Sequence, residues 1–581
     1  MFCTKFLLLL TYLIKITVQT SSPSSTSYVA AVLEYNFEND TAANLRNYLI
    51  YIQEASSKNA DIIVFPELTL NRGQDSIEVP INGALKDHPI PALAADLYHK
   101  VLVDISNAAR QNKIYVVINI EEIMDCNTAV GEYCPAQQTY LFNTNVVFDR
   151  DGTIIDRYRK INLFGEFTRT PALRPDLGVF TTDFGVTFAH YICFDLLFQV
   201  PAMQVVDKLN VTDVIFPTMW FSEMPYLSAV QIQEGYAFAM DVNFLAAGSN
   251  NVRVGSSGSG IFSGKAGALI STMPGLPTTK LLVATVPKIP GQVTSSPPGP
   301  IYDNPVDHDS LTLITDPSLE SHFTRLLTPG LSQFTMISGE VICVFKVNMT
   351  ENEPETEISS YKYRAAVFNG VRSYSGMATG GIRVCSVIAC TGDSLDTCGK
   401  RFPQYKLKST AVFHELNIIA TMPTPVIEDE IQARDTIYFP LSLDTSIMPL
   451  EPDDYTYSED INGNVTTYSM FLDRYDKELY SFAIWGRIFS RDGQEEDPKL
   501  PQETTLSPTE ETTENQDVTT EHQDNTTENQ DDTTEHQDNT TENQDDTTEH
   551  QDNTTEHQPD SSVTHLISKT ILITTFMLLI K

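Results

Sequence analysis

The most informative part of this 581-residue sequence is a strand-like stretch that ends in a cysteine, Val186-Thr187-Phe188-Ala189-His190-Tyr191-Ile192-Cys193-Phe194-Asp195. A cysteine on a tight turn at the carboxyl end of a strand is held where a nucleophile is needed. Two alternatives exist: a disulfide partner, which an oxidising compartment favours, and a buried thiol that packs as a small apolar side chain. The rest of the sequence distinguishes between these interpretations.

Short apolar runs alternate with longer helical stretches up to about residue 290, which predicts a layered α/β domain at 28–300. The expected strands are Val29–Leu33, Asp61–Phe65, Lys113–Ile120, Thr144–Phe148, Val186–Ile192, Val214–Pro217, Phe244–Gly248 and Lys280–Val286. The expected helices are Ala42–Ser57, Ala92–Asn112, Pro201–Leu209 and Ala229–Met240. The pair Asp151-Gly152 predicts a hairpin turn.

A chain of this length is too long for a single core, so further domains are expected. Pro, Gly and Ser are concentrated near residues 290–300, which predicts a linker. The following β-branched and aromatic runs predict a second, β-rich domain at 301–495. Its expected strands are Val341–Val347, Ala365–Phe368, Gly381–Val387, Ser409–Leu416 and Leu479–Phe489.

The N-terminus has the pattern of a secretory signal peptide. Met1 to Lys5 is followed by the apolar run Phe6–Ile14 and by polar residues from Thr20. We assign residues 1–22 to this signal. A transmembrane helix, the alternative, needs about 20 apolar residues, and Lys15 interrupts the run.

The C-terminus has the pattern of a glycosylphosphatidylinositol (GPI) attachment signal at 561–581. The apolar-dominated run Ile571–Ile580 is too short to span a bilayer comfortably. It follows a spacer, Val563–Thr570, and the short residues 560–562. Asp560 or Ser561 is the expected attachment residue. A short tail anchor is the alternative. The mature protein is therefore expected on the extracellular face of the plasma membrane, held in the outer leaflet by lipid.

Residues 496–560 are predicted to form a disordered acidic stalk. Between Pro501 and Asp560 lie 19 acidic residues and no Lys or Arg, which supply half of the net charge of -38. The segment repeats a Thr, Glu, Asn, Gln and Asp heptad with almost no apolar position, so a coiled coil has no core to form. Because no basic stripe offsets the charge, nucleic acid is not an expected partner.

N-glycosylation sequons predict surface loops in the globular part and a glycosylated spacer in the stalk. They begin at Asn39, Asn210, Asn348, Asn464, Asn525, Asn539 and Asn553.

The cysteine count leaves one thiol over. Of eight cysteines, Cys3 leaves with the signal peptide, and seven is an odd number. Cys126 and Cys134 bracket a short loop and predict a local bridge. The second domain holds Cys343, Cys385, Cys390 and Cys398, whose pairing stays open. By elimination, Cys193 is expected to be free.

Two charged residues complete a possible catalytic set with Cys193. Glu67 directly follows the apolar run Ile62–Pro66, and Lys160 lies in a mixed polar and apolar segment. Each alone would be read as a solvated surface residue. Together they predict that Glu67 takes the thiol proton and that Lys160 stabilises an oxyanion. The backbone N–H of Phe194 would be a second oxyanion donor.

These motifs resemble the vanin/biotinidase branch of the nitrilase, or carbon–nitrogen hydrolase, superfamily, and insect vanin-like proteins in particular. In the first domain they are Phe65-Pro66-Glu67, Lys160-Ile161-Asn162-Leu163-Phe164, Cys193-Phe194-Asp195-Leu196-Leu197-Phe198, Phe216-Pro217-Thr218-Met219-Trp220, Val242-Asn243-Phe244-Leu245-Ala246-Ala247 and Gly258-Ser259-Gly260-Ile261. In the second they are Tyr363-Arg364-Ala365-Ala366-Val367-Phe368-Asn369-Gly370-Val371-Arg372 and Cys385-Ser386-Val387. The resemblance covers about Tyr28 to Ser490.

The resemblance implies an αββα sandwich and hydrolysis of a small linear amide through a thioester on Cys193. Glu67 would be the general base and acid, Lys160 the oxyanion partner or proton donor, and Glu166 an auxiliary acid. No metal and no organic cofactor are implied. Vanins cleave pantetheine to pantothenate and cysteamine, and biotinidase cleaves biocytin. We expect a pantetheinase-like enzyme, with a biotinidase-like amidase or a catalytically silent surface binding protein as alternatives.

One departure from the family pattern lies beside the predicted base. Vertebrate vanins and biotinidase continue from the glutamate with Asp-Gly, whereas this chain has Leu68-Thr69. The triad is untouched, but the changed loop points to this segment as a place where the substrate could be selected.

Overall fold

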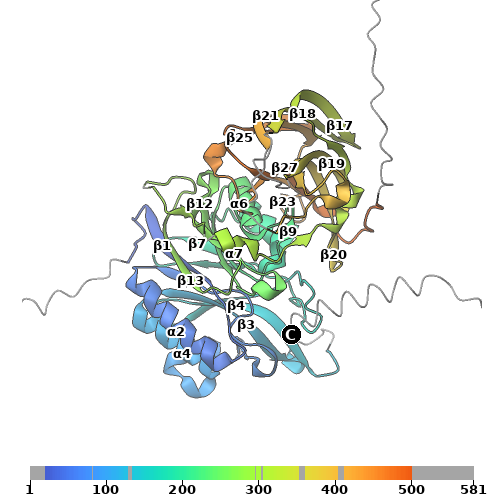
Figure 1. Cartoon of the computed structure of the whole chain (residues 1–581). Helices are drawn as coiled ribbons and strands as arrows, with labels where there is room; N and C mark the ends of the chain where they lie inside the picture. The colour runs from blue at the N-terminus through green and yellow to red at the C-terminus, as the bar shows by residue number, and fades with distance from the viewer. Residues whose placement is uncertain are drawn as a thin grey trace, which may run out of the picture. The chain divides into compact units, whose positions relative to one another are not determined.

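The computed structural model describes residues 20–81, 83–128, 134–294, 296–302, 305–351, 360–403 and 411–499. The predicted stalk, the attachment signal and nearly all of the signal peptide lie outside them. Within the described segments, no helix is both long and apolar enough to cross a membrane. They form an α/β sandwich followed by an all-β sandwich (Figure 1).

The first sheet of the α/β sandwich has the strand order β13-β1-β2-β3-β4-β5. These strands are β1 (Ser27–Glu34), β2 (Ile62–Val64), β3 (Tyr115–Asp125), β4 (Thr139–Phe148), β5 (Ile154–Arg159) and β13 (Lys280–Pro287). The crossover helices α2 (Thr41–Ser57) and α4 (Lys100–Asn112) lie on its outer face (Figure 1). Helix α2 begins at Asp40, whose carboxylate accepts hydrogen bonds from the N–H groups of Ala42 and Ala43.

The second sheet has the order β14-β12-β11-β10-β8-β7-β6. Its strands are β6 (Gly178–Thr181), β7 (Thr187–His190), β8 (Asp213–Thr218), β10 (Asn243–Gly248), β11 (Ser259–Ser263), β12 (Ala268–Thr272) and β14 (Gly299–Pro300). Helices α5 (Gln204–Asp207) and α6 (Ala229–Met240) belong to its outer layer, and an apolar core separates the two sheets. The predicted αββα sandwich is confirmed. Short elements complete it: α3 (Ala84–Asp87), β9 (Glu223–Met224), α7 (Pro305–Asp309) and β15 (Ile314–Thr315).

The second sandwich has two five-stranded sheets, β16-β19-β20-β27-β24 and β17-β18-β21-β26-β25. Their strands are β16 (Phe323–Leu326), β17 (Gly330–Ser338), β18 (Val341–Glu351), β19 (Lys362–Tyr374), β20 (Ala378–Cys390), β21 (Ala411–Pro423), β24 (Thr436–Asp444), β25 (Tyr455–Asn462), β26 (Val465–Leu472) and β27 (Leu479–Ile488). A small hairpin pairs β22 (Ile427–Glu428) with β23 (Ala433–Arg434). The β-rich character predicted for this part of the chain is confirmed.

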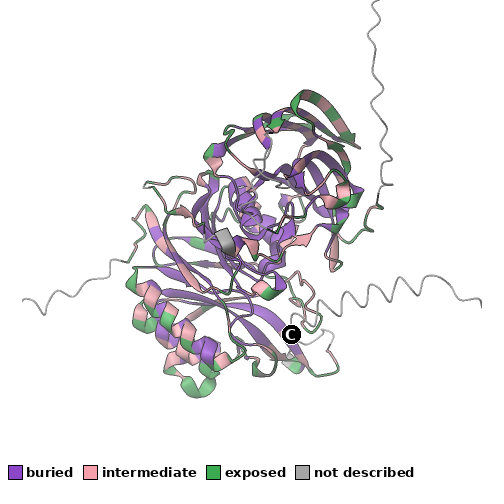
Figure 2. Ribbon diagram, viewed as in Figure 1, coloured by how far each residue is buried: buried purple, intermediate pink, exposed green. Residues whose placement is uncertain are grey.

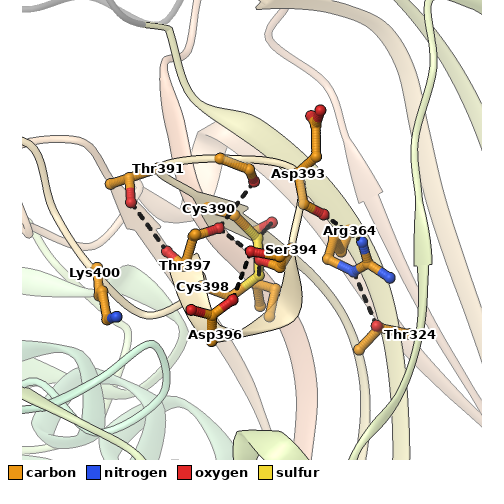
Figure 3. The surroundings of a disulfide bond; sticks show 12 residues. Thr324, Arg364, Cys390, Thr391, Asp393, Ser394, Asp396, Thr397, Cys398 and Lys400 are labelled. Carbon is orange, nitrogen blue, oxygen red and sulfur yellow. Dashed lines mark hydrogen bonds between the residues drawn. A yellow bond between two sulfur atoms is a disulfide. The ribbon is translucent and has the colours of Figure 1, made fainter. Parts of the chain in front are cut away.

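Three disulfides link cysteines of the described segments. Cys126 is bonded to Cys134, as expected, and Cys343 on β18 is bonded to Cys385 on β20, which joins the two sheets of the second sandwich. Cys390 is bonded to Cys398 across a turn that the Thr391 and Thr397 hydroxyls stabilise by hydrogen bonds to backbone carbonyls (Figure 3). Cys193 is the free cysteine among the described residues.

The two sandwiches pack tightly on helix α6. Every residue of α6 except Ala239 is buried, and β24 lies against the helix. Figure 2 shows the ribbon of this helix largely in the colour of buried residues. The packing at Gly235 is close, because a Cβ atom there would lie 2.5 Å from Leu441 Cδ2 of β24 and would force that side chain to move. The Asp207 carboxylate and the Arg434 guanidinium add an ion pair at 2.6 Å. The second sandwich therefore replaces solvent over this outer helix layer.

Two sequence-based expectations need correction. Residues 91–97 form two 3-10 turns and not the start of the predicted helix. Helix α4 begins only at Lys100, because the ring of His99 caps it by accepting a hydrogen bond from the Val101 N–H. Asn348 lies inside strand β18, paired with both neighbouring strands, and not in a loop. Asn39, Asn210 and Asn464 are exposed outside regular elements, and the stalk sequons lie outside the described residues.

Candidate active site

The ends of three strands bring the predicted catalytic residues together. Glu67 follows β2, Lys160 follows β5, and Cys193 follows β7, so the first sheet supplies the two charged groups and the second supplies the thiol. All three side chains are buried. Lys160 Nζ lies 2.8 Å from Glu67 Oε1. The αββα packing thus joins residues that are 93 and 33 positions apart in the chain, counting from Glu67 to Lys160 and from Lys160 to Cys193.

The turn that carries Cys193 is held in a strained conformation by Asp195. Cys193 has a φ of 49°, which lies in the left-handed region that residues other than glycine rarely adopt. Asp195 Oδ2 accepts hydrogen bonds from Tyr158 Oη at 2.7 Å and from the Ile192 N–H at 3.1 Å. Its Oδ1 accepts the Asn162 N–H at 2.8 Å, which links the cysteine turn to the segment after Lys160. Burial raises the pKa of Asp195 to about 6.

Three hydrogen-bond donors surround the Glu67 carboxylate. Its Oε1 accepts hydrogen bonds from Lys160 Nζ and, at 2.7 Å, from Asn143 Nδ2, and its Oε2 accepts the Met219 N–H at 2.7 Å. Burial opposes the charge of this carboxylate, but the Lys160 ammonium and the three hydrogen bonds outweigh burial and lower its pKa. Glu67 is therefore ionised at neutral pH and can accept a proton.

Glu166 joins the same cluster from the segment after Lys160. Its carboxylate is hydrogen bonded to Lys160 Nζ and accepts Asn143 Nδ2 at 3.1 Å. Burial alone would discharge Lys160, but the carboxylates of Glu166 and Glu67 raise its pKa well above the ordinary value. Two carboxylates thus keep one buried ammonium charged.

The Cys193 thiol is protonated at rest. Burial and the negative charge of Glu67 raise its pKa, and the opposing effect of Lys160 is smaller. The thiol lies 3.7 Å from the Met219 carbonyl oxygen, so Met219 contacts the nucleophile through its C=O and the carboxylate through its N–H. A neutral thiol needs a nearby base before it can attack a carbonyl carbon.

The thiol lies at the wall of a pocket in which half of the lining residues are aromatic. Its lining comprises Phe164, Cys193, Phe194, Leu197, Trp220, Phe221, Glu223, Leu227, Tyr374 and Ser375. Tyr374 is the last residue of β19 and Ser375 begins the turn to β20, so the second sandwich forms one wall of the pocket. The Tyr374 ring packs edge-on against Phe194, with centroids 5.5 Å apart.

The comparisons with known proteins agree with this geometry. Residues 29–286 match the carbon–nitrogen hydrolase family model, and residues 311–492 match the Vanin C-terminal domain. Vanin-like protein 2 of Drosophila melanogaster is 34% identical over 84% of this chain and 94% of its own length. The chain belongs to the vanin/biotinidase branch of the carbon–nitrogen hydrolases. Human biotinidase (28% identity, 77% of this chain and 84% of that protein) and human pantetheinase (28%, 75% and 83%) are further relatives.

This vanin-like chain is therefore a hydrolase of carbon–nitrogen bonds in linear amides. Its buried cluster can take a proton from the thiol at Glu67 and present the Lys160 ammonium to a developing negative charge. Within the described part of the chain, no group of three or more His, Cys, Asp or Glu side chains is arranged to hold a metal ion.

The unusual residues after Glu67 do not line the pocket. Leu68 is buried, and its N–H donates to Asn119 Oδ1 at 2.8 Å. The Thr69 hydroxyl lies 2.6 Å from Tyr48 Oη under helix α2. The structure therefore moves the question of substrate selection from this segment to the aromatic pocket.

Sequence reasoning missed several residues of the site. Asn143 and Met219 hold Glu67, while Glu223 and Tyr374 line the pocket. Asn143 left a usable signal, because it belongs to the polar run Asn143-Thr144-Asn145 inside a strand whose other residues are mostly apolar. Tyr374 left none, since it comes from the other domain.

Proposed function

We propose that the chain is an extracellular, GPI-anchored amidohydrolase that cleaves pantetheine to pantothenate and cysteamine through Cys193. The observation that carries the proposal is the buried contact between Lys160 and Glu67 beside a free thiol at the wall of a pocket. The 28% identical human pantetheinase supports the choice of substrate. The signal-like N-terminus, the attachment-like C-terminus and the acidic repeats support the location.

The proposed reaction has two halves. Glu67 removes the thiol proton as Cys193 attacks the amide carbon, and Lys160 and the Phe194 N–H stabilise the oxyanion. The tetrahedral intermediate collapses, the C–N bond breaks, and the amine leaves with the proton that Glu67 returns. Water, deprotonated by Glu67, then attacks the thioester, which releases the acid and restores the thiol.

Glu166 is proposed as the auxiliary acid. Its carboxylate accepts hydrogen bonds from both Lys160 Nζ and Asn143 Nδ2, and its charge keeps the ammonium protonated through the cycle. In this role it positions Lys160 and does not exchange protons with the substrate.

A biotinidase-like activity on biocytin is the second candidate. It is favoured by the 28% identity to human biotinidase over 77% of this chain. Both candidates use the same thioester chemistry and differ in the groups that flank the amide.

Purified ectodomain, residues 23–560, tests the activity when it is assayed with pantetheine and biocytin beside Cys193→Ala. Product from the wild type alone supports the proposal, and equal product from both proteins overturns it. Mass spectrometry of an acyl group on Cys193 identifies the acid half of the substrate. For the location, phosphatidylinositol-specific phospholipase C should release the full-length protein from cells. Retention after this treatment would contradict the GPI anchor.

A further inference from the structure

Glu223 is the charged side chain that lines the active-site pocket. The other lining side chains are aromatic, aliphatic, a serine and the Cys193 thiol. Glu223 is only 6% exposed, so its carboxylate has lost nearly all contact with bulk water. A buried ionised group is costly unless its oxygens are hydrogen bonded.

One oxygen of this carboxylate has a partner and the other has none. Oε2 accepts a hydrogen bond from Arg372 Nη2 at 2.7 Å. Oε1 is buried and has no hydrogen bond from any described residue. Burial raises the pKa of Glu223 to about 7, against the lowering effects of the Arg372 guanidinium and, more weakly, of the Ser375 backbone N–H. The carboxylate thus keeps a free acceptor at the wall of a reaction pocket.

The charges behind Glu223 do not balance when its carboxylate is ionised. Arg372 is completely buried, and its other terminal nitrogen lies 3.0 Å from the buried Asp316 carboxylate. With both acids ionised, this group of Arg372, Asp316 and Glu223 carries one net negative charge. Asp316 alone could neutralise the guanidinium. An ion pair that joins the two domains therefore needs only Asp316, and it does not explain why a second acid, Glu223, lies at the pocket.

From these contacts, we infer that Glu223 selects the substrate: its Oε1 accepts a hydrogen bond from a hydroxyl or ammonium group in one of the two parts of the substrate that flank the scissile amide. The inference rests on the proposed amidase activity at Cys193 and deepens it. It favours amides whose flanking groups carry such a donor over plain alkyl amides. Pantetheine brings hydroxyl groups on its acyl half, and biocytin brings an ammonium group on its leaving half.

Glu223→Gln is the informative variant. Arg372 needs an acceptor, so it holds the single carbonyl oxygen of the glutamine, and the NH₂ group takes the place of Oε1. A hydrogen-bond acceptor in the pocket becomes a donor, while the contact between the domains is kept. A site that is left with mismatched polar groups loses about 10- to 100-fold in kcat/KM.

The substrates come in matched pairs: pantetheine with its analogue lacking both hydroxyls, and biocytin with its analogue lacking the α-amino group. We expect Glu223→Gln to lower kcat/KM for one donor-bearing substrate 10- to 100-fold, mainly through KM, and to change its analogue less than twofold. The pair that responds identifies a hydroxyl or an ammonium as the donor. Equal losses within both pairs, or no loss at all, overturn the inference.

Asp316→Asn is the matched control, because it alters the same charged group without touching the pocket. It should leave the ratio of kcat/KM within each pair unchanged. Calorimetric titration of Cys193→Ala, with and without Glu223→Gln, tests recognition without turnover. If the wild type hydrolyses neither substrate, the proposed function fails. The calorimetric binding measurements then still decide whether Glu223 recognises the substrate. Equal binding of donor-bearing and donor-free ligands to Cys193→Ala, or no binding of either, overturns that role.

Discussion

Lys160 Nζ lies 2.8 Å from Glu67 Oε1, with both side chains buried between the two sheets. The contact fixes the charge state of both groups, since each stabilises the ionised form of the other. It also leaves the Cys193 thiol as the neutral member of the site. Removing any neighbour that sets this balance should therefore change the pH dependence of the reaction before it changes the fold.

Asn143→Ala should move the acidic limb of the kcat/KM profile to higher pH and lower the maximal rate about tenfold, the effect of losing about 1.4 kcal/mol. The Asn143 hydrogen bond lowers the pKa of Glu67. Without it this pKa rises, so the base is protonated at pH values where the wild type is active. A pH–rate profile from pH 4 to 9 measures the shift. Asn417→Ala, in the second sandwich, is the control, and an unshifted limb would contradict the role of Asn143.

Alkylation of Cys193 by iodoacetamide should keep accelerating with pH through the ordinary thiol value of 9.0, because burial and Glu67 raise the pKa of this thiol. Glu67→Gln removes a negative charge, so the curve should move to lower pH even though hydrolysis is lost. Mass spectrometry of the labelled peptide gives the rates. A plateau below pH 7 in the wild type would mean that the resting state is a thiolate.

Tyr374→Ala should raise KM about tenfold with a smaller change in kcat, because it removes the pocket wall that the second sandwich supplies. Tyr374→Phe is the matched control. The buried Tyr374 hydroxyl has no hydrogen bond from any described residue, so its loss should leave KM unchanged. Steady-state kinetics of the two variants are compared. If Tyr374→Ala leaves KM unchanged, the second sandwich does not shape the substrate site.

Arg372→Met should destabilise the protein by about 3–5 kcal/mol, the cost of leaving buried charges unpaired. The loss should be larger at pH 8 than at pH 5. Arg372 lowers the pKa of Glu223, so without it this pKa rises above about 7. Both proteins lose stability as pH rises from 4.5 to about 7, because the folded state holds a proton that the unfolded chain releases, and only the variant goes on losing stability above about 7. Urea unfolding at both pH values measures the difference.

The exposed Arg474 pairs with Asp476 and provides the control, since Arg474→Met should leave the urea midpoint unchanged at both pH values. Equal losses for Arg372→Met at pH 5 and pH 8 would show that burial of apolar surface, and not charge pairing, holds the junction.

The sequence alone determined the layered α/β fold and the β-rich second domain, and it identified Glu67, Lys160 and Cys193 as the candidate site residues. Strand periodicity, the odd cysteine count and the positions of Glu67, Lys160 and Cys193 after apolar runs are local signals. These survive folding because each strand end projects its next residue from the edge of a sheet.

Only the tertiary structure decided which neighbours complete the site. Asn143, Met219, Glu223 and Tyr374 approach the thiol or its base through sheet packing and domain contact, which no local pattern encodes. The same packing buried Leu68 and Thr69 away from the pocket. The sequence specifies the chemistry of each side chain. The charge states of the site and the walls of its pocket depend on which distant groups fold against one another and exclude water.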